Sequence, residues 1–144
     1  MVNEDTFSLL KECDAGVKMA TDSLDDARKY ASTSEMRALL NTSRQQHEWI
    51  GREVEDMLKK CGGKEREPHP MARRMASVKT NVKLTADNSE ESIAEIISDG
   101  CHMGVKSLYQ YLHEYESADE KARDLAKDLI RLEENLADDM NPYL

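Results

Sequence analysis

Proline, glycine and aromatic residues are scarce in this sequence. Its 144 residues include three Pro, six Gly, one Phe, one Trp and five Tyr. Ala, Leu, Lys, Glu and Met are frequent instead, and each of these residues has a high intrinsic helix propensity. We therefore predict an all-α protein, and a chain of this length is sufficient to bury one hydrophobic core.

Cysteine is also scarce, and its spacing excludes two classes of small fold. Cys13, Cys61 and Cys101 are odd in number and form no Cys-x-x-Cys pair. A disulfide framework and a zinc knuckle both need paired cysteines, so neither is expected. We predict reduced thiols, with Cys13 and Cys101 packed in the core as small hydrophobic side chains rather than acting as a redox pair.

Clusters of basic residues and long apolar runs are absent from the sequence. The formal net charge is -9 and the sequence pI is about 4.9. Lys and Arg are interspersed with acids, which argues against a surface that binds the nucleic-acid backbone. No apolar run approaches the length of a membrane span, and the polar, acidic start lacks the features of a signal peptide. We expect a soluble cytoplasmic protein without nucleic-acid or membrane partners.

Motifs of common enzyme classes are lacking as well. No Ser-His-Asp spacing, nucleotide-binding loop or pair of catalytic carboxylates can be assigned. We therefore propose neither hydrolase nor transferase activity and name no catalytic residue. No cofactor is expected unless it is a metal ion.

Two segments of similar sequence, 13–18 (CDAGVK) and 101–106 (CHMGVK), each lie in a long helical pattern that is followed by a second one. Such a repeat is typical of two related helical hairpins, and hence of a duplicated four-helix bundle. We place the first hairpin at about 4–62 and the second at about 88–141, within a single domain that comprises the whole chain. A crossover with a short helix is predicted over 63–87.

Apolar residues recur at intervals of three and four residues in four stretches, which is the pattern of helices with one buried face. The predicted buried positions are Phe7, Leu10, Asp14, Val17, Thr21, Leu24, Ala27 and Ala31; Met36, Leu40, Ser43, His47, Ile50, Val54, Met57 and Cys61; Ile93, Ile97, Cys101, Val105, Leu108 and Leu112; and Ala122, Leu125, Leu129, Leu132 and Leu136. Capping boxes at Ser32–Glu35 and Ser117–Glu120, and a start near Asn88 or Ser89, predict where three of the helices begin. Asn141–Pro142 is expected to stop the last helix.

Several short stretches, spread over nearly the whole chain, carry a resemblance to a known superfamily. They are Asp14 with Gly16-Val17-Lys18, the stretch Ser43-Arg44-Gln45-Gln46-His47, Gly62-Gly63, Asp99-Gly100 before Cys101, and Leu132-Glu133-Glu134-Asn135-Leu136. Together these stretches resemble the ferritin-like superfamily, and within it small bacterial families of unknown function with a two-hairpin bundle of this length. The resemblance implies a ferritin-like antiparallel four-helix bundle.

The resemblance also implies a site for two iron or manganese ions in the bundle core. In that superfamily the ligands are a Glu from each of two helices and a Glu-x-x-His from each of the other two. This chain offers Asp14, His47, His102 and Glu133 from its four helices. Arg44 occupies the place of the Glu in the motif of the second helix, and a permanent cation there repels a metal. We therefore expect a degenerate site without a working dinuclear centre.

Two interpretations of these residues remain open. In the first, Asp14, His47 and Arg44 form a buried hydrogen-bonded network in place of the metal. In the second, the four candidate ligands bind a single zinc, iron or manganese ion. Glu133 fits the buried stripe of its helix better than its neighbour Glu134 does, and the register of that helix decides between the two.

From these observations we expect a non-catalytic scaffold or interaction protein. A metal-binding protein with oxidoreductase or metal-storage activity is the alternative, and a small-molecule pocket between the hairpins is a third hypothesis. The acidic composition favours basic or helical partners. A homodimer is also predicted, through Tyr109, Tyr111 and Tyr115, if these are exposed together with Leu108 or Leu112.

Overall fold

The structure, a computed structural model, describes residues 3–61, 84 and 87–144. Its helices are α1 (Glu4–Tyr30), α2 (Ser34–Lys60), α4 (Glu90–Glu114) and α5 (Glu120–Met140), and α5 is followed by the short 3₁₀-helix η1 (Asn141–Tyr143). No strand occurs among the described residues. The all-α prediction is confirmed, and the helix pairs lie within the ranges predicted for the two hairpins.

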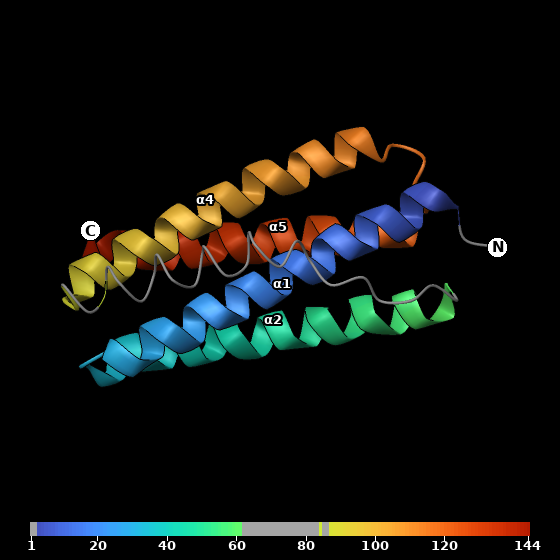
Figure 1. Ribbon diagram of the computed structural model, residues 1–144. Coiled ribbons are helices and arrows are strands. Elements are labelled where there is room, and N and C mark those ends of the chain that lie inside the picture. The colour runs from blue at the N-terminus through green and yellow to red at the C-terminus, as the bar shows by residue number, and fades with distance from the viewer. Residues whose placement is uncertain (1–2, 62–83, 85–86) are drawn as a thin grey trace.

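The four long helices lie side by side as two antiparallel hairpins (Figure 1). α1 and α5 run in one direction, and α2 and α4 run in the other. α1 packs against the other three helices, and α5 packs against α2 and α4 as well. The directions therefore read up, down, down, up, which is the order of a bundle with one long crossover rather than of an up-down-up-down bundle.

Two helix starts test the capping predictions directly. The N-cap of α2 is Thr33, whose hydroxyl accepts a hydrogen bond from the Met36 N–H, so the prediction of Ser32 is wrong by one residue. Of the two predicted start positions for α4, Asn88 and Ser89, the N-cap is Ser89, whose hydroxyl accepts a hydrogen bond from the Ser92 N–H. Each cap satisfies an N–H group that has no partner inside its helix.

The start of α5 differs from the prediction. Its N-cap is Asp119, whose side chain makes no capping hydrogen bond, so the capping box predicted at Ser117 is wrong. The N–H of Ser117 instead donates to Asp5, and its carbonyl accepts from the Asn3 side chain at 2.7 Å. The Asp119 N–H donates to the hydroxyl of Thr6 at 2.7 Å. The first turn of α1 is thus fastened to the turn before α5, and these tertiary bonds replace the local cap.

The predicted end of the last helix is confirmed, whereas the predicted crossover is almost wholly outside the described residues. α5 ends at Met140, directly before Asn141–Pro142. Of the range 63–87, the structure describes Leu84, which is fully buried, and Asp87, which accepts a hydrogen bond from the N–H of Ser89.

The core consists of two apolar clusters, one towards each end of the bundle. The first includes Leu9, Leu10, Val54, Leu58, Leu112, Ala122 and Leu129, and the second includes Leu24, Met36, Leu40, Ile93, Ile97, Leu136 and Met140. Of the predicted buried positions, Phe7, Thr21, Met57, Cys61 and Val105 are half-buried and all the others are buried. Along α2 and α5, polar side chains lie between the two clusters.

Candidate functional site

The buried polar side chains define the candidate site. They are Thr6, Asp14, Asp26, Ser43, His47, Ser98 and Glu133. His47 is fully buried and Glu133 is 7% exposed, whereas Glu134 is exposed. The preference for Glu133 over Glu134 as the inward residue is therefore confirmed. Three of the four candidate ligands, Asp14, His47 and Glu133, lie inside the bundle.

His47 and Glu133 contact each other directly and join α2 to α5. Nε2 of His47 lies against Oε1 of Glu133. Nδ1 lies 2.7 Å from the carbonyl oxygen of Ser43, and because that oxygen can only accept, Nδ1 carries a proton. A hydrogen bond between Nε2 and Oε1 requires one further proton, carried by either group. The pair is therefore an imidazolium with a carboxylate or a neutral imidazole with a carboxylic acid.

Cys101 lies beside the same carboxyl group. Burial raises the pKa of its thiol above the ordinary value of 9.0, and the charge of Glu133 and a hydrogen bond to it raise this pKa further. Burial, followed by the charges of Glu12 and Asp14, raises the pKa of Cys13 to about 12. Both thiols are therefore protonated at neutral pH, and neither supplies a thiolate ligand or nucleophile. The prediction that both pack in the core as free cysteines is confirmed.

The carboxylate of Asp14 is paired within its own helix. Nζ of Lys18 lies 2.9 Å from Oδ2 of Asp14, at the i, i+4 spacing of α1. An acid four residues before a base is the more favourable order for such a pair on a helix. The predicted network of Asp14 with His47 and Arg44 is therefore wrong, because each of the three has other partners.

Arg44 lies at the edge of α2 that faces α1, with 29% of its side chain exposed. Its Nε donates to Oδ1 of Asp25 at 2.5 Å, and its Nη1 donates to Glu48. Hydrogen bonds to these two carboxylates raise the pKa of the Arg44 guanidinium above its ordinary value. Asp25 and Glu48 thus compensate the charge of Arg44 outside the core. This charge therefore has little effect on whether a metal binds near His47.

His102 is exposed, although it occupies the place in the repeat that Asp14 occupies in the first hairpin. The two copies of the repeat therefore differ in how their second residue is oriented, and a common site that includes both residues does not form. Cys13 and Cys101, which precede them, are both buried.

The aromatic surface predicted for a dimer is not formed by the described residues of α4. Tyr109 is 55% exposed, but Leu108 and Leu112 are buried. Tyr111 and Tyr115 are half-buried and stack on each other, with ring centroids 6.4 Å apart. The homodimer therefore remains a prediction, and the described residues of α4 do not form the exposed aromatic surface that was expected for it.

The residues present do not fit the metal site that the resemblance implies. A bound ion needs the lone pairs of several ligands to be directed at one point. Here Nε2 of His47 points at Glu133 itself. Asp14 is paired with Lys18, and His102 lies on the exterior. Within residues 3–61, 84 and 87–144, no group of three or more His, Cys, Asp and Glu side chains is arranged to hold a metal ion.

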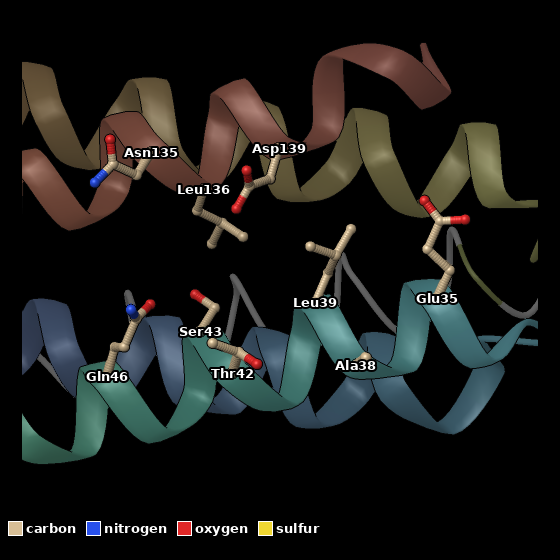
Figure 2. A pocket seen from close by; sticks show the side chains of 9 residues that line it. All are labelled: Glu35, Ala38, Leu39, Thr42, Ser43, Gln46, Asn135, Leu136 and Asp139. Atoms are coloured by element: carbon tan, nitrogen blue, oxygen red, sulfur yellow. The ribbon is translucent and has the colours of Figure 1, made fainter.

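A surface groove lies between α2 and α5, next to the His47–Glu133 pair. It has a volume of about 250 Å³, and its lining consists of apolar Ala38, Leu39 and Leu136, the carboxylates Glu35 and Asp139, the amides Gln46 and Asn135, and the hydroxyls Thr42 and Ser43. Figure 2 shows the two leucines between the helices, the amides towards one end, Glu35 towards the other and Asp139 nearer the middle. We call it the α2–α5 groove. It reaches the buried pair through Ser43, which contacts His47.

Comparison with known proteins assigns no family to the chain. Family models, curated proteins and solved structures were compared with it, and none matches. In the part of the chain that the structure describes, no helix combines the length and the apolar character needed to cross a membrane. The site is therefore interpreted from its own geometry.

Proposed function

We propose that the protein is a non-catalytic, ferritin-like helical bundle that acts as an interaction protein. The direct contact between His47 and Glu133 carries this proposal, because the two side chains best placed to bind a metal use their coordinating atoms on each other. The parallel directions of α2 and α4 support the ferritin-like topology, since such bundles have one long crossover connection.

The His47–Glu133 pair is, in this proposal, what remains of a metal site. The two residues lie on α2 and α5 at positions where the resemblance places ligands, and a proton now stands where a cation would. Their role is structural. Each satisfies a polar group that would cost about 1–3 kcal/mol if it were buried without a partner, and together they fix which side of α2 meets α5.

Elemental analysis tests the proposal. The protein is purified without chelator, and metal content is measured before and after reconstitution with Fe(II), Mn(II) and Zn(II). We expect well below one ion per chain under every condition, because the lone pair of His47 Nε2 and the carboxyl group of Glu133 are already engaged.

Two variants identify the source of any metal that is found. His47→Ala removes the buried imidazole, and His102→Ala removes an exposed one as the matched control. Stoichiometric metal that is lost in His47→Ala and retained in His102→Ala would overturn the proposal. It would support a protein with iron, manganese or zinc bound in the core and with oxidoreductase or metal-storage activity.

A further inference from the structure

The α2–α5 groove combines an apolar floor with acidic side chains. Among the residues that the structure describes, the lining carries the carboxylates of Glu35 and Asp139 and no basic side chain. Glu35 accepts a hydrogen bond from the hydroxyl of Tyr143 at 2.5 Å, and this bond raises the pKa of Tyr143 to about 12. The hydroxyl thus stays neutral and leaves the charge of Glu35 in place. A ligand that fits this groove needs an apolar surface to pack on its floor and positive charge to meet Glu35 and Asp139.

Trp49 extends this surface along α2. It follows Gln46 by three residues, so the two side chains lie on the same side of the helix. Trp49 is 56% exposed, which is unusual for the largest amphipathic side chain in a protein. From Ala38 to Trp49, the side of α2 that borders the groove carries no charged residue, and both Arg52 and Glu53 follow Trp49 within about one turn. Along α2, the surface is therefore acidic at Glu35, uncharged from Ala38 to Trp49 and balanced in charge beyond Trp49.

We propose that the α2–α5 groove and Trp49 bind a basic amphipathic helix of a partner protein. This inference rests on the proposed function as an interaction protein and names its partner by chemistry. The apolar side of the partner helix packs on Leu39 and Leu136, and its Lys or Arg residues meet Glu35 and Asp139. From Glu35 to Trp49, fourteen residues of α2 rise about 21 Å, which is about four turns of a partner helix.

The charge of the surface argues against other occupants. A second copy of this chain that docked through the same groove would bring these carboxylates against their counterparts, and the described lining has no basic residue to offset them. Nucleic acid and anionic lipid carry the same sign of charge as the groove and are repelled by it. An extended peptide has no sheet edge to join, because the described residues contain no strand.

The fluorescence of Trp49 provides a direct test, because it is the single Trp of the sequence. The full-length protein is titrated with a synthetic helical peptide that has Leu at i, i+3, i+4 and i+7 and Lys at both ends. A second peptide has Glu in place of Lys, and a third is a scrambled form of the first. We expect a saturable blue shift of the Trp49 emission with the first peptide only, since binding removes the indole from water.

A matched pair of variants locates the binding site. Asp139→Asn removes a carboxylate of the groove, whereas Asp138→Asn removes the same charge from an adjacent exposed position that does not line it. At ionic strength near 0.15 M, where charges beyond about 8 Å are screened, Asp139→Asn should weaken peptide binding about two- to fivefold. Asp138→Asn should leave the affinity unchanged.

Several outcomes would overturn the proposal. They are no change in Trp49 emission, equal binding of the acidic or the scrambled peptide, and equal effects of the two Asn variants. A shift of Trp49 emission with protein concentration alone, accompanied by a larger mass in sedimentation, would assign the surface to a second copy instead. None of these outcomes alters the metal analysis, so a failure here is distinguishable from a failure of the proposed function.

Discussion

At the scale of single residues, His47 and Glu133 depend on each other for their hydrogen bonds. His47→Leu leaves a buried carboxyl group without its partner, and Glu133→Leu leaves Nε2 of His47 without one. We expect each single change to lower the free energy of unfolding by about 3 kcal/mol. The double change removes both polar groups, so its cost should be smaller than the sum of the single costs by at least about 1 kcal/mol.

Urea denaturation of the four proteins in this cycle measures the coupling. His102→Leu is the control for the loss of an imidazole, and at its exposed position we expect a change within about 0.5 kcal/mol. Additive costs for His47→Leu and Glu133→Leu would show that the pair contributes no mutual stabilisation.

The three cysteines differ in how well the fold protects them. Cys13 and Cys101 are buried, and burial raises the pKa of both thiols. Cys61 is half-buried, at the end of α2, and burial raises the pKa of its thiol as well. Because an alkylating reagent reaches a half-buried thiol more readily than a buried one, alkylation of the folded protein should modify Cys61 first and spare the other two until the chain unfolds. Mass spectrometry of the alkylated protein checks this order, and rapid labelling of Cys13 in the folded state would contradict it.

At the scale of helices, two glycines in helix interiors have different surroundings. A methyl group added at Gly100 of α4 would meet nothing within 4 Å, whereas one added at Gly51 of α2 would lie 3.0 Å from Cγ1 of Val17. Gly100→Ala should therefore stabilise the protein by about 0.5–1 kcal/mol, through the higher helix propensity of alanine. Gly51→Ala should show no such gain, because Val17 has to move and the α1–α2 contact is disturbed.

Thermal unfolding of both variants measures the difference. The two substitutions are chemically identical and both lie inside helices, so the change in helix propensity is the same for each. An equal rise in melting temperature would show that α1 and α2 are not in close contact at Gly51.

The sequence predicted the helices well because their signals are local. Each helix has one face that packs on the others, and the spacing of apolar residues records that face. Ser89 was found as a cap because its hydroxyl bonds within its own helix. The Asp14–Lys18 and Arg44–Glu48 pairs have i, i+4 spacing that is also readable in the sequence. This spacing indicates that Asp14 and Arg44 can each pair with a residue of their own helix.

At the scale of the whole molecule, the candidate site depends on how helices are placed relative to one another. His47 and Glu133 are 86 residues apart, and nothing in the sequence states that they touch. Their burial could be predicted from the spacing of apolar residues. Their pairing could not, because it depends on how α2 and α5 are rotated relative to each other about their axes. The N-cap of α5 was predicted at the wrong residue for the same reason: it depends on how the helices are placed. The hydrogen-bond partners of Ser117 and Asp119 lie in the first turn of α1. The exposure of His102 likewise follows from the rotation of α4, which the repeat with α1 did not reveal.

The bonds between the first turn of α1 and the turn before α5 also set an order for folding. They join residues that are 112 to 114 positions apart in the chain. During synthesis Asn3 and Thr6 leave the ribosome long before Ser117 and Asp119 do, so none of these bonds can form while the first hairpin is the only one present. Closure of this end of the bundle is therefore possible only after the segment that contains Ser117 and Asp119 has been synthesised.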